Sequence, residues 1–263
     1  MSDFPAGTVW LVGAGPGDPE LLTRKAERLL MAADIVFHDA LVSSAILDLI
    51  PPDVTLKTVG KRSGRHSTPQ PLICRMVVAA AREGQRVVRL KGGDPSIFGR
   101  AHEEIEACEE AGVPIQICAG VTTASAAAAS LNTSLTKRGL ARRLTFVTAH
   151  TRKGAVPELD WEALADPQAT IAIYMGKGAA PHIARGLMQA GLAKDTPVAL
   201  VENVSLPDER HFQTRLDTLP IAARTALGDG PAIILIGEAM RTSDDYTEAL
   251  AGAVSNEAEQ LKE

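Results

Sequence analysis

The sequence has few cysteines, and none of them stands in a metal-binding or disulfide pattern. Its 263 residues include three, Cys74, Cys108 and Cys118, with no C-x-x-C pair and no histidine pair beside them. An odd number without such spacing argues against both a disulfide framework and a zinc site. We therefore expect three small, buried hydrophobic side chains and no bound metal.

The sequence also lacks a targeting segment, a membrane span and an excess of basic charge. Its first residues, MSDFPAGT, have no basic region followed by an apolar core, and no apolar run approaches the ~18 residues of a transmembrane helix. The formal net charge is -5, with 45% hydrophobic and 22% charged residues, as in an ordinary globular protein. We expect a cytoplasmic protein that binds neither nucleic acids nor membranes.

Short apolar segments alternate with helical patterns along the chain. In the first half, strands are predicted at 9–12, 34–38, 54–59, 86–91 and 114–118, and helices from Leu21, over 71–84, over 99–111 and over 122–130. In the second half, strands are predicted at 143–150, 169–175, 197–203 and 231–237. The alternation predicts an α/β fold with a mainly parallel first sheet. We place the N-terminal domain at 1–125, the C-terminal domain at 126–245 and a polar tail at 246–263.

The first strand leads into a glycine-rich turn, GAGPGDPE, at residues 13–20. A turn of this kind between a strand and a helix is what dinucleotide folds use to bind a pyrophosphate. Here Asp18 takes the place of the third small residue and Pro19 follows it, which indicates an N-cap and a first helical residue. Because the carboxylate would occupy the backbone amides and repel a phosphate, we predict an uncharged or cationic ligand.

Asp39 keeps another interpretation open. It follows the first turn by ~20 residues, where dinucleotide folds place an acidic residue on a ribose hydroxyl. An NAD-linked oxidoreductase is therefore an alternative. However, a second turn, KGGDP at 91–95, also puts a carboxylate after two glycines at a strand end. Two acidic turns at strand ends favour a ligand with hydroxyls, amines or a positive centre.

Several segments, in a fixed order, carry a resemblance to a known family. They are VWLVGAGPGDPELLT, DIVFHDALV, VGKRSGRHSTPQ, RVVRLKGGDPSIFGRAHEE, AGVTTASAAA, LTFVTAH, YMGKG, VALVEN and PAIILIGEA. Over residues 8–239 the sequence resembles the uroporphyrinogen-III C-methyltransferases, a branch of the tetrapyrrole methylase family. The resemblance implies two α/β domains with the active site in the cleft between them, commonly in a homodimer. It also implies S-adenosylmethionine as cofactor, S-adenosylhomocysteine as product, and no metal.

The cofactor contacts implied by the resemblance fall in both halves of the chain. They are Pro16, Gly92, Gly93, Asp94, Ile97, Thr122, Thr123, Met175, Val204 and Ala232. Asp94 suits an acceptor for ribose or amino groups, and Met175 suits an apolar contact for adenine. A sulfonium cofactor has no phosphate, so the carboxylate of Asp18 would not repel it.

The acid and base positions of the family fall on Asp39 and Lys61. The substrate of this branch is uroporphyrinogen III, a cyclic tetrapyrrole with eight carboxylates, and methylation at C2 and C7 gives precorrin-2. Arginine binds carboxylates through two parallel hydrogen bonds, so cations are expected around the substrate. The predicted substrate-binding residues are Lys61, Arg62, Arg100, Glu103, Lys137 and Arg138, with Arg100 also catalytic and Glu103 holding it through an i, i+3 pair.

The sequence departs from the usual family pattern at three places. Ala119 stands where proline is common, residues 132–134 read Asn-Thr-Ser where Gly-Ile-Pro is usual, and Lys137 replaces a common histidine. We expect a changed ratio of mono- to dimethylated product and the same type of reaction. Service in siroheme, cobalamin or haem d1 synthesis is left open. So are a related methylase acting on another precorrin, a protein or RNA, and a non-catalytic tetrapyrrole binder.

Overall fold

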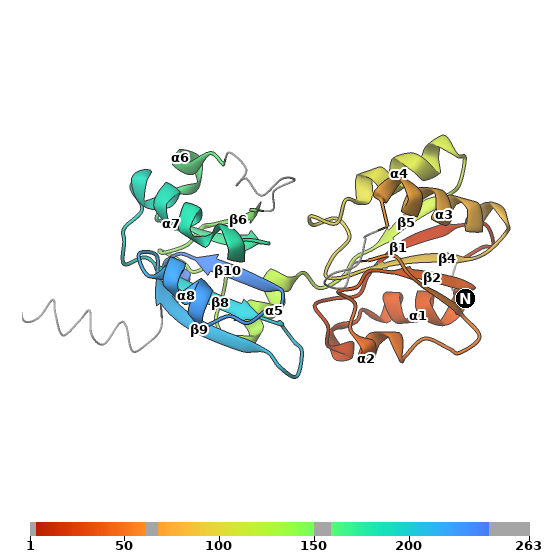
Figure 1. Ribbon diagram of the computed structural model, residues 1–263, viewed down its shortest axis with the longest axis horizontal. Helices are drawn as coiled ribbons and strands as arrows, with labels where there is room; N and C mark the ends of the chain where they lie inside the picture. The colour runs from red at the N-terminus through yellow and green to blue at the C-terminus, as the bar shows by residue number, and fades with distance from the viewer. Residues whose placement is uncertain (1–3, 61–67, 150–158, 242–263) are drawn as a thin grey trace, which may run out of the picture. The chain divides into compact units, whose positions relative to one another are not determined.

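The chain divides into two units. The computed structural model describes residues 4–60, 68–149 and 159–241 (Figure 1). The N-terminal unit contains residues 1–126 and 204–207, and the C-terminal unit contains residues 127–203 and 208–263. The division after residue 126 lies next to the boundary predicted after residue 125, whereas the return of residues 204–207 to the N-terminal unit was not predicted.

Five parallel strands form the sheet of the N-terminal unit, in the order β3-β2-β4-β1-β5. Their bounds are β1 (Val9–Gly13), β2 (Ile35–His38), β3 (Thr55–Thr58), β4 (Val87–Lys91) and β5 (Ile115–Cys118). β1 and β4 are buried along their whole length, as is usual for central strands of a parallel sheet. The prediction of a mainly parallel sheet is confirmed by these pairings.

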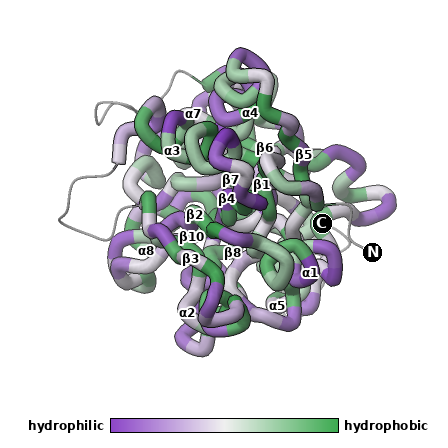
Figure 2. The backbone as a smooth tube through the Cα atoms, turned by 90° about the vertical axis from the view of Figure 1, so that its right-hand side faces the viewer, coloured by the Kyte–Doolittle hydropathy of each residue, from purple (hydrophilic) through white to green (hydrophobic). Residues whose placement is uncertain are grey.

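Helices cover both faces of this sheet, with α3 and α4 on one face and α1 and α2 on the other (Figure 1). Their bounds are α1 (Arg24–Ala32), α2 (Ser44–Leu47), α3 (Gln70–Arg82) and α4 (Ala101–Glu110), and α5 (Thr123–Ser130) follows β5. Because side chains alternate along a strand, Trp10 packs in the cluster that includes Leu29 of α1, whereas Leu11 packs in the cluster that includes Val77 of α3. The helices carry both hydrophilic and hydrophobic stretches (Figure 2).

The helix predicted from Leu21 begins later, at Arg24. Thr23 is its N-cap, because the Thr23 hydroxyl accepts a hydrogen bond from the backbone N–H of Ala26 at 3.1 Å. Asp18 is an N-cap as predicted, but of the short 3-10 helix η1 (Pro19–Leu21) and not of α1. The apolar spacing therefore identified the helix, and local capping decided where it starts.

The C-terminal unit has a mixed sheet in the order β6-β7-β10-β8-β9. Its strands are β6 (Arg143–Thr148), β7 (Ala169–Tyr174), β8 (Pro197–Glu202), β9 (Arg210–Arg215) and β10 (Ala232–Ile236). β6 and β7 are parallel, and the other pairs are antiparallel. Its helices are α6 (Trp161–Leu164), η2 (Lys177–Ala179), α7 (Ala180–Gln189), α8 (Leu219–Thr225) and η3 (Glu238–Met240). Strand β9 was not predicted.

All three cysteines are buried and free, as predicted. Burial raises the pKa of the Cys108 thiol to about 11 and also raises the pKa values of Cys74 and Cys118. Since only the thiolate reacts, we expect no alkylation of the native protein by iodoacetamide at about pH 8. Mass spectrometry after unfolding in urea should show three modified thiols. Rapid modification of the native protein would contradict this burial.

Candidate active site

The two glycine-rich turns of the N-terminal unit are hydrogen-bonded to each other. The first follows β1 and the second follows β4, and these strands are adjacent and parallel, so both turns emerge at the same edge. The backbone N–H of Ala14 donates to the carbonyl of Lys91 at 2.8 Å. Gly15 and Gly93 exchange two backbone hydrogen bonds of 3.1 and 2.7 Å. The two turns therefore form one backbone surface at the carboxyl edge of the sheet, where open α/β sheets bind ligands.

Glycine is required where the ends of three strands approach one another. A Cβ atom on Gly13 would lie 2.6 Å from the Cα atom of Gly120, and one on Gly120 would lie 2.2 Å from the carbonyl oxygen of Gly93. Either contact is far shorter than van der Waals packing allows. The first turn is thus glycine-rich because its backbone packs against its neighbours, and a phosphate is not needed to explain it.

Several amides of the first turn are already used by the protein. The Asp18 carboxylate accepts from the backbone N–H of Glu20 at 2.9 Å, and the backbone N–H of Asp18 donates to the Ser205 hydroxyl at 2.9 Å. A pyrophosphate needs free amides of this kind at a helix N-terminus. The arrangement therefore disfavours the dinucleotide alternative.

Asp94 joins the second turn to the end of β5. Its Oδ2 atom accepts from the backbone N–H of Gly120 at 2.9 Å, and its Oδ1 atom accepts from the backbone N–H and the hydroxyl of Ser96. A carboxylate has about four acceptor positions, so these three bonds leave capacity for one ligand donor. The geometry fits a ribose hydroxyl or an amino group beside the two glycines.

The candidate cofactor residues of the N-terminal unit gather at this edge. Each follows β1, β4 or β5, which are neighbours in the sheet, except Val204, which the chain returns to the same unit. These residues are Pro16, Gly92, Gly93, Asp94, Ile97, Thr122, Thr123 and Val204. The Thr123 hydroxyl lies 3.9 Å from the position that a Cβ of Gly93 would occupy. The turn after β5 and the second glycine turn are thus in contact.

The other two candidates lie side by side in the C-terminal unit. Ile233 pairs with Tyr174 in the antiparallel β7–β10 ladder, so Ala232 comes opposite Met175. Met175 has a φ of 55° and is 48% exposed. A left-handed backbone costs a residue other than glycine about 1–2 kcal/mol, so the surrounding structure must hold Met175 in this conformation.

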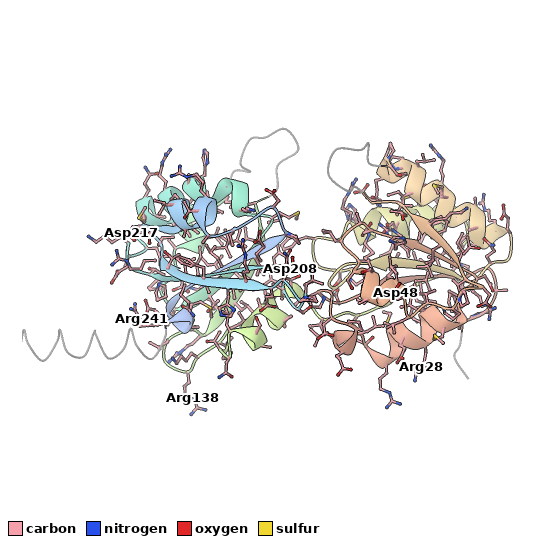
Figure 3. The ribbon with its side chains drawn as sticks, turned by 60° about the horizontal axis from the view of Figure 1, so that its bottom comes forward. Arg28, Asp48, Arg138, Asp208, Asp217 and Arg241 are labelled. Atoms are coloured by element: carbon pink, nitrogen blue, oxygen red, sulfur yellow. The ribbon has the colours of Figure 1, made fainter. Side chains whose placement is uncertain are left out.

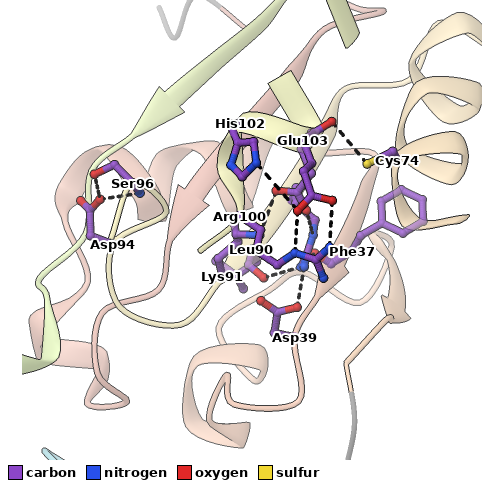
Figure 4. A network of polar contacts seen from close by, with 12 residues as sticks. Phe37, Asp39, Cys74, Leu90, Lys91, Asp94, Ser96, Arg100, His102 and Glu103 are labelled. Carbon is purple, nitrogen blue, oxygen red and sulfur yellow. Dashed lines mark hydrogen bonds and ion pairs between the residues drawn. The ribbon is translucent and has the colours of Figure 1, made fainter. Parts of the chain in front are cut away.

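Asp39 follows β2 and is held by a buried arginine. Arg89 Nη2 donates to Asp39 Oδ1 at 2.5 Å, and the backbone N–H of Asp39 donates to the carbonyl of Leu90 at 3.2 Å (Figure 4). The Asp39 side chain is 29% exposed, so it remains accessible to a ligand. Its predicted partner Lys61 and the substrate candidate Arg62 lie outside the described residues.

Arg100 and Glu103 form the predicted i, i+3 pair. Arg100 Nε and Nη2 donate to the two carboxylate oxygens of Glu103 at 2.7 and 2.8 Å (Figure 4). Arg100 is the N-cap of α4 and has a φ of 56°, whereas we expected it on the first helical turn. Lys137 and Arg138 belong to the C-terminal unit, where Lys137 and Ala141 exchange two backbone hydrogen bonds; Arg138 is exposed (Figure 3).

Comparison with known protein families accounts for this arrangement. The family model described as Tetrapyrrole (Corrin/Porphyrin) Methylases matches residues 8–220. The chain belongs to this family. The match covers the glycine turns, Asp39, Arg100 and Met175. The fold of the chain is the two-unit α/β architecture described above.

Individual relatives of this tetrapyrrole methylase are closely similar to it. The uroporphyrinogen-III C-methyltransferase of Pseudomonas aeruginosa is 48% identical over 237 residues, which are 90% of this chain and 95% of the relative. The siroheme synthase of Gluconobacter oxydans is 46% identical over 236 residues, which are 90% of this chain and 50% of the relative. The chain thus spans half the length of that siroheme synthase.

A solved structure shares the fold. The uroporphyrin-III C-methyltransferase of Thermus thermophilus, complexed with S-adenosyl homocysteine, superposes with a TM-score of 0.75 at 39% identity. The alignment covers 88% of this chain and 98% of that chain. The likeness extends over both units of the tetrapyrrole methylase.

Glu202 was not predicted as a functional residue. Its carboxylate links the ends of the strands around Ala232. It is 2% exposed, and its carboxylate accepts from the backbone N–H groups of Gly228 and Gly230 at 2.8 and 3.0 Å and from Arg210 at 2.8 Å. Lys177, two residues after Met175, lies 3.5 Å from the same carboxylate. The sequence pattern that could have indicated Glu202 is an acidic residue at the end of an otherwise apolar strand, VALVE.

Replacing Glu202 with glutamine is expected to lower the free energy of unfolding. Burial alone would raise the pKa of Glu202, but the hydrogen bonds from Gly228 and Arg210 and the charge of Lys177 hold this pKa below its ordinary value. A glutamine NH₂ group would face donors, at a cost of roughly 1–3 kcal/mol.

Urea denaturation checks this prediction over a range of pH. A lowered pKa in the folded state stabilises the fold above the unfolded-state pKa, and this contribution is lost as the pH falls through the folded-state pKa. The difference between wild type and Glu202→Gln should therefore be full near neutral pH and shrink below about pH 4. Glu162 is exposed, so Glu162→Gln is the matched control. Its free energy of unfolding should equal that of the wild type at every pH. A loss of stability in Glu202→Gln that does not depend on pH would contradict a stabilising role for the Glu202 charge.

The described residues offer no metal site and no membrane span. Within residues 4–60, 68–149 and 159–241, no three histidine, cysteine, aspartate or glutamate side chains are grouped so that they could hold a metal ion. In the same residues no helix is long and apolar enough to cross a membrane.

Proposed function

We propose that this tetrapyrrole methylase methylates uroporphyrinogen III at C2 and C7, using S-adenosylmethionine, to give precorrin-2 and S-adenosylhomocysteine. The observation that carries the proposal is the carboxyl edge of the first sheet, where the paired glycine turns, Asp39 and Arg100 follow adjacent strands. The 48% identity to the Pseudomonas enzyme of this name supports it. We propose service in siroheme, cobalamin or haem d1 synthesis.

The residues of the site suit this chemistry. S-adenosylmethionine, when bound, supplies the sulfonium methyl group that becomes attached to an electron-rich pyrrole carbon. Asp94 and the backbone of Gly93 would hold its polar end, and Met175 would contact its adenine. Arg100, with Lys61, Arg62, Lys137 and Arg138, would bind the substrate carboxylates, and Glu103 would hold Arg100 in place. After the new carbon–carbon bond forms, a proton must leave the macrocycle, and the partly exposed carboxylate of Asp39 can receive it.

Incubation with methyl-labelled S-adenosylmethionine and uroporphyrinogen III tests the proposal. Mass spectrometry should show one and then two added methyl groups, with the mono- to dimethylated ratio reflecting the unusual residues Ala119, Asn132 to Ser134 and Lys137. Calorimetric titration should show binding of S-adenosylhomocysteine and none of NAD. Saturable NAD binding without a response to S-adenosylhomocysteine would restore the oxidoreductase alternative. Methylation of another precorrin only would place the chain elsewhere in the family.

The proposal includes a homodimer, as the sequence resemblance implies. Light scattering coupled to size-exclusion chromatography should give twice the mass of one chain, which is 27.7 kDa. A fully active monomer would contradict the proposed homodimer and would not affect the proposed reaction. The expected cytoplasmic location stays a prediction.

A further inference from the structure

A chain of alternating charges runs through the interior of the N-terminal unit. Lys91 Nζ donates to Glu104 Oε2 at 2.8 Å, Arg89 Nε donates to Glu104 Oε1 at 2.9 Å, and Arg89 Nη2 donates to Asp39 Oδ1 at 2.5 Å. The side chains of Arg89, Lys91 and Glu104 are 2%, 4% and 0% exposed. Only Asp39, at 29%, reaches the surface. The order is therefore an accessible carboxylate backed by three buried charges.

Arg89 connects Asp39 to the rigid part of the sheet. Besides the two carboxylates, its Nη1 atom donates to the carbonyl of Leu90 at 3.0 Å, and the same carbonyl accepts the backbone N–H of Asp39. A guanidinium is planar, so its donors keep fixed directions once several of them are bound. Burial alone would lower the pKa of Arg89, but Asp39 and Glu104 raise it above its ordinary value. Arg89 is therefore a permanent cation that fixes the direction of Asp39 Oδ1.

The second carboxylate oxygen is left for other partners. In the part of the chain that the structure describes, Asp39 Oδ2 accepts no hydrogen bond. One oxygen of Asp39 is thus held from the interior, and the other is available to a ligand at the carboxyl edge of the sheet.

Stability alone does not explain this buried network. Charges lose their hydration when buried, and replacing such groups by well-packed apolar residues is often neutral or stabilising. We infer that Arg89 is a positioning residue that holds Asp39 for proton transfer, and that Glu104, itself held by Lys91, holds Arg89. This inference rests on the proposed function, because it concerns the same reaction.

A double-mutant cycle tests the inference. Lysine keeps the charge of Arg89, but its single nitrogen cannot reproduce the two fixed contacts that Nε and Nη2 make to Glu104 and Asp39, so Arg89→Lys should misplace Asp39 and lower kcat by about 10²-fold. It should leave the Kd for S-adenosylhomocysteine and the KM for S-adenosylmethionine unchanged. In the Asp39→Asn background, the same change should lower kcat by less than about threefold, because there is no carboxylate left to position.

The matched control lies at the other end of the same two strands. Arg86 binds Asp34 through two hydrogen bonds of 3.1 and 2.7 Å, just before β4 and β2 begin. Arg86→Lys should leave kcat unchanged. An equal loss from Arg89→Lys with and without Asp39 would show a structural role and overturn the inference. If Arg89→Lys does not fold, Glu104→Gln, which weakens the hold on Arg89, should show the same dependence on Asp39, and its absence would overturn the inference equally.

Failure of the proposed function can be told apart from failure of this inference. If the wild-type protein transfers no methyl group to uroporphyrinogen III, the proposed function fails by itself. Crystal structures of wild type and Arg89→Lys then decide the inference without any turnover. A displaced Asp39 carboxylate with an unchanged backbone supports it, and an unmoved carboxylate overturns it.

Discussion

Replacing Asp39 with asparagine is expected to lower kcat for methylation of uroporphyrinogen III by about 10²–10⁴-fold, the usual effect of losing one proton-transfer group. Asparagine keeps the shape of the side chain, and its carbonyl oxygen can still accept from Arg89, which holds Asp39 Oδ1 at 2.5 Å. It cannot take up a proton. The fold and the affinity for S-adenosylhomocysteine should therefore stay near wild type. Single-turnover kinetics measures the rate of methylation, and calorimetry measures the affinity for S-adenosylhomocysteine.

Asp48→Asn is the matched control, since Asp48 is an exposed aspartate that follows α2 on the same unit (Figure 3). It should have wild-type kcat. Lys61→Ala is expected to resemble Asp39→Asn if the two residues share the proton step. Wild-type turnover of Asp39→Asn would show that Asp39 is not needed for the proton step.

Replacing Arg100 with alanine is expected to reduce methylation by orders of magnitude while S-adenosylhomocysteine still binds. The macrodipole of α4 opposes a cation at its N-terminus by about 0.3–1 kcal/mol, so stability gives little reason for an arginine at this N-cap. The left-handed φ of 56° adds a further cost. Glu103 accepts from Nε and Nη2 of Arg100, and in the proposed function the remaining N–H groups of the guanidinium would bind a substrate carboxylate. Arg100→Lys should also be impaired, because an ammonium cannot make the planar two-bond contact.

The C-terminal unit supplies a control pair of the same two residue types, in the reverse order along the chain. Arg241 makes an i, i+3 pair with Glu238 through two hydrogen bonds of 2.8 and 2.9 Å. Arg241→Ala removes a partly buried i, i+3 pair, and because Arg241 has no part in the proposed site, activity should be retained. If Arg100→Ala is as active as Arg241→Ala, the substrate carboxylates are bound elsewhere, with Arg138 as the first alternative.

The buried strands could be predicted from the sequence because their apolar runs are continuous. The strands predicted at 86–91 and 169–175 are observed at Val87–Lys91 and Ala169–Tyr174. Strand β9 could not be predicted in this way, because RHFQTR is polar and largely exposed and its pairing with β8 defines it. The glycine turns were located correctly, but their reason, the close approach of Gly13 to Gly120, involves residues far apart in sequence.

The buried charges around Arg89 could not be predicted from the sequence, because they also depend on residues far apart along the chain. Asp39 and Arg100 were predicted as site residues from motifs, whereas Arg89 and Lys91 in RVVRLK were predicted only as strand residues. Their partner Glu104 comes 15 residues after Arg89 and on a helix. Two cations in a central strand, with a carboxylate facing them from the covering helix, are a usable signal only once the strand is known to be buried.

The return of residues 204–207 to the N-terminal unit has a consequence for fragments of this protein. Ser205 accepts the backbone N–H of Asp18, and a Cβ on Gly17 would lie 2.4 Å from Leu206, so this short segment packs directly on the first glycine turn. A polypeptide cut after residue 126 would lack that packing, although it would retain every strand of its sheet. The N-terminal half expressed alone should therefore fold poorly at the first turn, and joining residues 204–207 to it through a linker should restore the fold of that turn.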